Sequence, residues 1–204
     1  FYTNSSSGNT MQQIYKNIYN SKSLKKKYPR VSELWYQWDG KPMIVGKTSE
    51  ASEEIKEFFT IKEAQWPNAQ KTANGFPWME FHRSLDEASV YGRKGRKEVV
   101  NVSVAQHSAT VCFSRTAWYG ANDRTRCWHD GKNDTSEDAI LYGYNFAEQW
   151  EFAIAQDPEM IFVTGWNEWV AQRQPSWGGA PISFVDCADY NNSRDVEPTA
   201  GVFG

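Results

Sequence analysis

The segment Ile161-Phe162-Val163-Thr164-Gly165-Trp166-Asn167-Glu168-Trp169 decides the fold that we predict for this chain. It opens with apolar β-branched and aromatic residues, which are typical of a buried strand, and Gly165 indicates where that strand ends. The polar residues Asn167 and Glu168 then stand between two tryptophans. Because α/β folds build their active sites at the carboxyl ends of strands, we predict that this strand carries the Glu168 carboxylate into such a site.

Strand-like and helix-like patterns alternate along the rest of the chain. Strands are predicted at residues 1–4, 42–46, 59–62, 77–82, 99–105, 160–165 and 181–185, and helices at residues 11–19 (capped by residues 8–10), 51–58 and 136–156. The stretch 106–135 is rich in Trp, His, Arg and Asp, and it is far longer than the usual connection of about 4 to 6 residues. We predict that this stretch is a functional loop.

This alternation predicts an α/β fold, in which parallel strands are joined by crossover helices. Only about four or five strand and helix units fit in the chain, whereas a complete (β/α)8 TIM barrel takes about 250 residues. We therefore expect a single barrel domain over residues 1–204, representing the C-terminal half or more of a (β/α)8 barrel and lacking its N-terminal strands.

Aromatic residues are unusually frequent, with 10 Trp, 10 Tyr and 11 Phe making up 15% of the chain. Flat aromatic rings stack on the C–H faces of sugars, so a carbohydrate partner is a reasonable expectation, although most individual rings should belong to the core. The net charge of −3 gives no indication of a nucleic-acid partner. We interpret the basic clusters Lys25-Lys26-Lys27 and Arg93–Lys97 as solvated loops.

No motif in the sequence predicts a cofactor or a metal. Dinucleotide-binding, phosphate-loop, zinc-protease and serine-hydrolase motifs are missing, and Cys112, Cys127 and Cys187 lack metal-ligand spacing, leaving one disulfide and one free thiol as an option. No apolar run reaches the roughly 20 residues that span a bilayer, so we expect no membrane partner. The oligomeric state stays open, and the compartment is undecided, with a secreted or periplasmic location slightly favoured.

Glycoside hydrolysis normally requires two carboxyl groups on either side of the scissile bond. Glu168 is the best candidate, because Trp166 and Trp169 give it surroundings of low polarity that would raise a carboxyl pKa. Glu80 is the second, because alternation in an extended strand puts Trp78, Glu80 and His82 on one face. The structural alternatives are a polar pair at a barrel rim for Glu168, and an ion pair with Arg83 or Lys97 for Glu80.

Further polar and aromatic side chains are suited to binding sugar hydroxyls and ring faces. The predicted substrate-binding residues are Asn167, Trp166, Trp169, His82, His107, Trp78, Trp118, Tyr119, Trp128 and Arg124. Asp39 precedes its strand, and we interpret it as a turn residue.

Two motifs resemble a known family. Gly165-Trp166-Asn167-Glu168-Trp169, followed by Val196-Glu197-Pro198, resembles the Asn-Glu-Trp and Glu-Pro pattern of the endo-α-mannosidase-like glycoside hydrolases and their WbsX-like relatives. Asp39-Gly40-Lys41-Pro42 is similar to the strand entry of the same group. The resemblance covers residues 39–198, and it implies a (β/α)8 barrel that hydrolyses glycosidic bonds of polysaccharides or glycans without a metal-based mechanism.

The chain departs from this family pattern in two ways. It lacks the His-x-Glu-Pro-Tyr-like segment associated with the catalytic acid, and its interval between Trp169 and Glu197 is longer than the pattern. The second carboxylate would then come from residues upstream of Phe1 or from Glu80. The alternatives are a glycan-binding protein without turnover, and a structural or assembly protein whose tryptophans contact other proteins.

Overall fold

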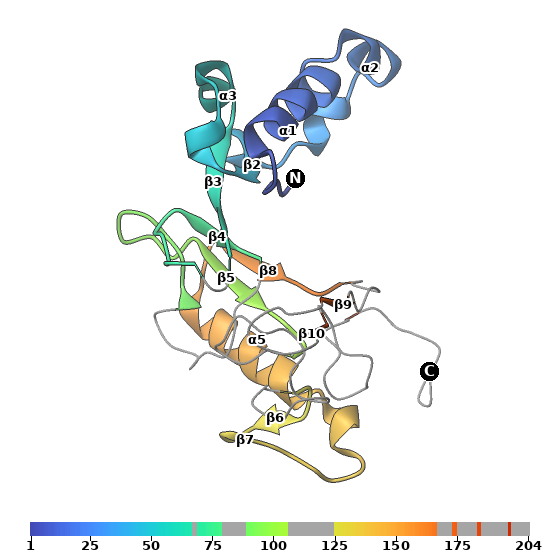
Figure 1. Ribbon diagram of the computed structural model, residues 1–204, viewed down its shortest axis with the longest axis vertical. Helices are drawn as coiled ribbons and strands as arrows, with labels where there is room; N and C mark the ends of the chain where they lie inside the picture. Colours follow the sequence, from blue (N-terminus) through green and yellow to red (C-terminus); the bar gives the residue numbers. More distant parts are fainter. Residues whose placement is uncertain are drawn as a thin grey trace. The chain divides into compact units, whose positions relative to one another are not determined.

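The computed structural model describes residues 1–66, 69–78, 89–105 and 125–166, together with 173–174, 183–184 and 196. The chain divides into two compact units (Figure 1). Unit 1 comprises Phe1–Gln65 and Lys71–Phe76, and unit 2 comprises Trp66–Gln70 and Pro77–Gly204. Each unit is described by itself below.

The sheet of unit 1 has the order β1-β2-β3-β4. Its strands are β1 (Gln37–Trp38), β2 (Lys41–Gly46), β3 (Thr60–Gln65) and β4 (Gly75–Pro77). Strands β2 and β3 are parallel, and Tyr2 forms a parallel bridge with Val45 of β2. The Thr3 amide donates to the Val45 carbonyl at 2.8 Å, which confirms the strand end predicted at residues 1–4.

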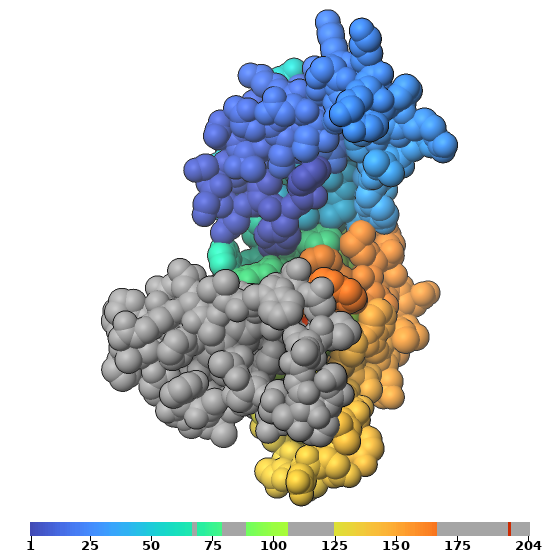
Figure 2. Space-filling model, turned by 90° about the vertical axis from the view of Figure 1, so that its right-hand side faces the viewer, coloured from blue at the N-terminus to red at the C-terminus, as the bar shows by residue number. Residues whose placement is uncertain are grey.

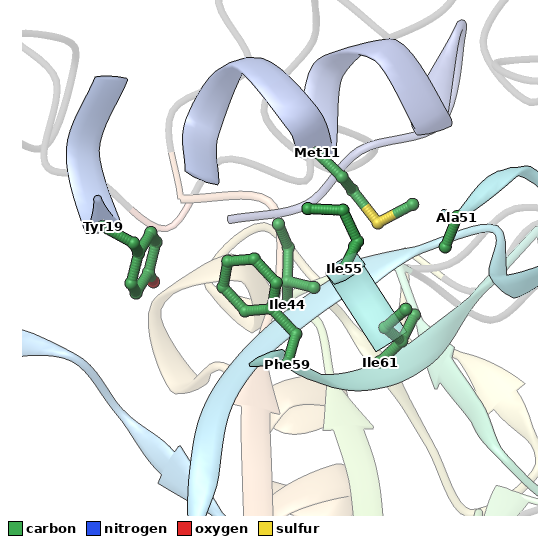
Figure 3. Packing of buried hydrophobic residues seen from close by; sticks show 7 residues of the cluster. All are labelled: Met11, Tyr19, Ile44, Ala51, Ile55, Phe59 and Ile61. Carbon is green, nitrogen blue, oxygen red and sulfur yellow. The ribbon is translucent and has the colours of Figure 1, made fainter. Parts of the chain in front are cut away.

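The helices of unit 1 connect these parallel segments. They are α1 (Ser7–Ile14), which continues as the π-helix η1 (Tyr15–Tyr19), then α2 (Lys22–Lys27), η2 (Val31–Leu34), η3 (Thr48–Glu50) and α3 (Glu53–Phe58). Helix α3 begins two residues after the predicted start at residue 51, because Ser52 caps it by accepting the Ile55 amide. The buried residues between helices and sheet form one cluster (Figure 3), consisting of Met11, Tyr19, Ile44, Ala51, Ile55, Phe59 and Ile61.

Helix α1 begins earlier than the sequence predicted, and the predicted cap at residues 8–10 was wrong. The Ser7 hydroxyl is completely buried, where it lies 2.8 Å from the Thr3 hydroxyl and accepts the Lys47 amide at 2.9 Å. These tertiary contacts stabilise the first turn, so the helix passes through Gly8 without ending there.

Unit 2 contains a parallel strand pair covered by a helix. Strands β5 (Val99–Val102) and β8 (Met160–Val163) pair in register, and helix α5 (Tyr144–Gln156) lies between them in the sequence. Side chains of α5 pack on one face of the pair, around a buried cluster of Val100, Val102 and Ala153. The helix predicted at 136–156 is interrupted by Gly143, whose φ of 60° ends the short helix η5 (Ala139–Tyr142) before α5 starts.

Two hairpins are each closed by a two-residue turn that consists of an Asp-Gly pair. Asp39 and Gly40, with φ of 51° and 78°, join β1 to β2, which confirms Asp39 as a turn residue. Asp130 and Gly131, with φ of 50° and 80°, join β6 (Trp128–His129) to β7 (Lys132–Asn133) inside the predicted loop. Positive φ at both central residues defines the type I′ turn that Asp-Gly favours.

The remaining described strands are β9 (Arg173–Gln174) and β10 (Ser183–Phe184), which pair antiparallel. The described residues therefore contain both helices and parallel strand pairs. The TIM barrel and the single domain stay predictions. Among the residues that the structure describes, no helix combines the length and the apolar character required to cross a membrane.

Candidate functional site

The carboxyl ends of β5 and β8 lie side by side. Val102 pairs with Val163, and the Thr164 amide extends the ladder by donating to the Val102 carbonyl at 3.0 Å. The chain stays buried just beyond β5, with Ser103 2% exposed, and just beyond β8, with Thr164 5% exposed. Because the strands are parallel, the segments that leave them start from the same edge.

Two amide side chains of α5 hold the segment that leaves β5. The Gln149 Oε1 accepts the Ser103 amide at 2.9 Å, and the Asn145 Nδ2 donates to the Val104 carbonyl at 2.8 Å and to the Ser103 carbonyl at 3.3 Å. Both amides are only 1% exposed, so these hydrogen bonds form away from water. They fix the backbone just before Gln106 and His107.

The segment that leaves β8 turns outward at Gly165. This residue has a φ of 74°, a conformation that favours glycine, and the next side chain, Trp166, is 59% exposed. The Val196 amide donates to the Gly165 carbonyl at 3.0 Å. A segment thirty-one positions further along the chain is therefore attached just before Trp166 and Asn167.

Most of the predicted site residues lie outside the described residues, so the structure does not test their positions. These are Glu168, Glu80, Asn167, Trp169, His82, His107, Trp118, Tyr119 and Arg124. The described ones are Trp166, Trp78 and Trp128. Trp78 packs edge-on against Trp66, with ring centroids 4.8 Å apart.

Trp66 was not predicted as a site residue, yet it is 39% exposed beside Trp78. Its place directly after β3 was the available signal, because residues that follow parallel strands gather at one edge. The pair Trp66 and Trp78 joins two segments that are separate in sequence.

Trp128 lies half-buried in the β6–β7 hairpin, next to a polar cluster that the sequence indicated only in part. The His129 Nδ1 lies 3.1 Å from Asp130 Oδ2, and the Nε2 lies 3.3 Å from Asp134 Oδ2. The His129 ring also stacks on Tyr144, with centroids 4.0 Å apart. The predicted functional loop at 106–135 contains His129, Asp130 and Asp134, but no pattern in the sequence indicated that they meet one another and Tyr144, because the hairpin and the start of α5 bring them together.

Hydrogen bonds to Asp134 lower its pKa to about 2. The largest causes are the Ser136 amide at 2.8 Å and the Ser136 hydroxyl at 2.7 Å, followed by the contact with His129. Each of these donors favours the ionised carboxylate. Asp134 is therefore a fixed anion that organises the hairpin.

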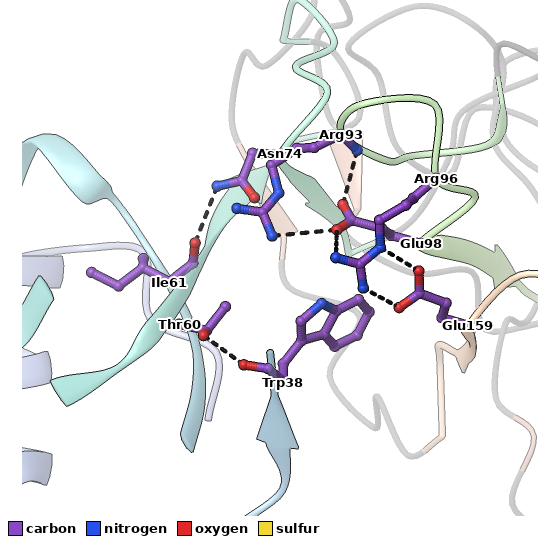
Figure 4. A network of polar contacts seen from close by, with 8 residues as sticks. All are labelled: Trp38, Thr60, Ile61, Asn74, Arg93, Arg96, Glu98 and Glu159. Atoms are coloured by element: carbon purple, nitrogen blue, oxygen red, sulfur yellow. Dashed lines mark hydrogen bonds and ion pairs between the residues drawn. The ribbon is translucent and has the colours of Figure 1, made fainter. Parts of the chain in front are cut away.

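The amino ends of β5 and β8 carry an ion network (Figure 4). Glu98, which is completely buried, accepts the Arg93 amide at 3.0 Å and lies 3.6 Å from the Arg96 guanidinium. Arg96 also donates to Glu159 at 2.6 Å. Since this network precedes both strands, it lies at the edge opposite to the predicted site and has a structural role.

Residues 93–97 form a loop in which Lys94 and Lys97 are exposed, as interpreted from the sequence, although Arg93 and Arg96 also pair with glutamates. The same interpretation was wrong for Lys25-Lys26-Lys27, which are exposed but lie in helix α2 (Lys22–Lys27).

Among the described residues, no group of three or more His, Cys, Asp or Glu side chains is placed to hold a metal ion. Cys127 is a buried free thiol, and its burial raises the pKa of the thiol. Cys112 and Cys187 lie outside the described residues. Asn101, in β5, is completely buried.

Comparison of the chain with protein-family models, with curated proteins and with solved structures gives no match.

Proposed function

We propose that this chain is a glycoside hydrolase of the endo-α-mannosidase-like barrel group, which cleaves glycosidic bonds of a polysaccharide or glycan with a pair of carboxyl groups and no metal. The observation that carries the proposal is the hydrogen bond between Gly165 and Val196 at the carboxyl end of β8. It joins the two sequence segments, 165–169 and 196–198, on which the family resemblance rests.

Glu168 is proposed as one essential carboxylate. It is three residues beyond Gly165, and Glu197 directly follows Val196, whose amide is bonded to the Gly165 carbonyl. Because consecutive Cα atoms are about 3.8 Å apart, neither glutamate can be far from that hydrogen bond. The long interval between Trp169 and Glu197 is therefore compatible with both motifs serving one site.

The second carboxylate is proposed to be Glu80, and the Gly165–Val196 bond adds Glu197 as a competitor. In a two-carboxylate mechanism one group protonates the leaving oxygen, while the other attacks the sugar or activates water. Glutamine substitutions of Glu80 and Glu197 distinguish them. The variant of the catalytic glutamate should lose turnover and show an altered pH profile of kcat. The other variant should keep the wild-type turnover and the wild-type pH profile.

Aromatic side chains near the strand ends support a carbohydrate ligand. Trp166 presents an exposed ring just beyond β8, and Trp66 with Trp78 forms an exposed to half-buried pair. Indole rings combine an apolar face, which stacks on sugar C–H groups, with a polar N–H edge that tolerates water. We propose that Trp166 forms a sugar-binding subsite together with Asn167 and Trp169.

Release of new reducing ends from a panel of purified polysaccharides and glycans tests the proposal. The wild-type chain is expected to cleave at least one of them, and Glu168→Gln is expected to bind that glycan without cleaving it. Glu137→Gln, which changes an exposed carboxylate before η5, is the matched control and should cleave normally. Glycan binding without cleavage by the wild-type chain would instead identify a carbohydrate-binding protein.

A further inference from the structure

The segment 21–36 concentrates positive charge on a chain whose net charge is −3. All of the lysines of α2 are exposed, namely Lys22, Lys25, Lys26 and Lys27. Within the part of the chain that the structure describes, none of these lysines forms an ion pair with a carboxylate. The segment therefore presents an uncompensated cationic surface.

Exposed apolar side chains accompany the lysines. Leu34, at the end of η2, is 83% exposed, while Tyr28 is 51% and Tyr36 is 55% exposed. Helices α2 and η2 lie against each other, so both kinds of side chain belong to one surface. An isolated exposed leucine is ordinary, but an aliphatic side chain flanked by tyrosines and lysines is typical of segments that rest on a lipid surface.

Trp35 holds this segment in place. Its ring packs against Tyr19 with centroids 4.3 Å apart, and Lys25 Nζ lies 5.7 Å from the ring centroid. Its neighbours Leu34 and Tyr36 are exposed. The outward side chains are therefore presented by an anchored backbone.

The surface lies away from the carboxyl ends of the strands of unit 1. Gly46, at the carboxyl end of β2, lies against Ser7 at the start of α1, whereas α2 lies beyond the far end of α1 (Figure 1). In the space-filling view the mid-blue segment forms one end of unit 1, where its side chains project outward (Figure 2). A partner bound there would leave the carboxyl ends of β2 and β3 uncovered.

We propose that Lys22, Lys25, Lys26, Lys27, Tyr28, Leu34 and Tyr36 form a lysine–leucine surface that docks reversibly on an anionic lipid membrane. Lysine ammonium groups bind anionic headgroups, while Leu34 and the tyrosine rings enter the boundary between headgroups and acyl chains. Exposed Leu34 favours a membrane over an anionic glycan or a nucleic acid as the partner, because only the membrane offers an apolar phase to an aliphatic side chain. This proposal departs from the expectation of no membrane partner, which rested only on the lack of an apolar run long enough to span a bilayer.

Co-sedimentation with vesicles tests the proposal on the full chain. The probes are vesicles of phosphatidylcholine alone and of equimolar phosphatidylcholine and phosphatidylserine. Two variants, the triple variant K25Q/K26Q/K27Q and the single variant L34S, are compared with a control, K94Q/K97Q/K132Q, which removes the same charge from exposed positions in unit 2. Circular dichroism checks that each variant is folded.

We expect binding to the anionic vesicles only, weakening as salt is added. The triple variant should bind about 100-fold more weakly, because each lysine contributes about 1 kcal/mol near an anionic surface, and L34S should also bind more weakly while the control binds normally. Equal loss in the triple variant and the control would overturn the proposal. The proposal would also be overturned if the chain bound dextran sulfate as tightly as it binds vesicles and if L34S did not weaken that binding. This result would identify a polyanionic glycan as the partner.

Discussion

Gly46, the last residue of β2, occupies a position that no larger side chain fits. A Cβ atom there would lie 2.6 Å from Thr3 Oγ1, 2.7 Å from Ser7 Oγ and 2.8 Å from Met11 Sδ. Ser7 and Met11 are completely buried. We predict that Gly46→Ala lowers the free energy of unfolding by roughly 1–3 kcal/mol, because the start of α1 must move away from the strand. Denaturant titration measures the change.

Gly131, in the β6–β7 turn, provides a contrasting substitution. Its φ is 80°, but no atom lies within 4 Å of an added Cβ. Gly131→Ala should therefore cost only the backbone strain of a left-handed residue, about 1 kcal/mol. If Gly131→Ala lowered the free energy of unfolding more than Gly46→Ala, the close approach of Thr3, Ser7 and Met11 to Gly46 would not explain the loss at Gly46.

Asp134 makes the stability of unit 2 depend on pH in the acid range. An unfolded aspartate titrates near pH 3.9, whereas the pKa of folded Asp134 is about 2. A lowered pKa in the folded state adds stability that is fully present above about pH 4 and is lost as the pH falls toward 2. We predict that Asp134→Asn reduces the loss of unfolding free energy between pH 4 and pH 2.

Asp130→Asn is the control for that titration. Asp130 also contacts His129, but its side chain is 87% exposed. This variant should keep the wild-type pH dependence. Identical pH dependence in the wild type and Asp134→Asn would show that the Ser136 hydrogen bonds do not hold the Asp134 carboxylate in solution.

Helix α5 and strand β5 are coupled at the level of elements by the buried amides of Asn145 and Gln149. Gln149→Ala leaves the Ser103 amide without its acceptor, so we predict a loss of about 1–3 kcal/mol in unfolding free energy. Faster hydrogen exchange at the Ser103 amide should accompany that loss. If β5 helps to position His107, turnover on a glycan substrate should fall as well.

Glu151→Ala changes an exposed residue of the same helix and is the control for Gln149. It should leave both the Ser103 exchange rate and the unfolding free energy nearly unchanged. An unaltered exchange rate in Gln149→Ala would contradict the coupling of α5 to the end of β5.

The elements show which features local sequence could predict. Strands β2 and β8 follow from apolar β-branched runs, and the end of α5 follows from Asp157-Pro158. The early start of α1 could not be predicted, because it depends on Ser7 meeting Thr3 and Lys47 across the chain. The β6–β7 hairpin was missed although Asp130-Gly131 is a strong hairpin signal, since the length of the surrounding segment favoured a loop.

At the scale of the whole molecule, the sequence predicted an alternation of strands and helices that the described residues follow. The edge shared by β5 and β8 was predictable, because parallel strands end together. The hydrogen bond from Val196 to Gly165 was not, because no local pattern indicates which distant segment returns to a strand end. That bond joins Gly165 and Val196, the first residues of the two segments that carry the family resemblance, and the proposed function depends on it.

The turnover of Glu168→Gln on a glycan that the wild-type chain cleaves is the most direct test of the proposed function. We predict that kcat falls at least about 100-fold, because an uncharged amide can neither transfer a proton nor act as a nucleophile, while the affinity for the glycan is retained. Hydrolysis by Glu168→Gln at the wild-type rate would contradict the assignment of Glu168 as an essential carboxylate.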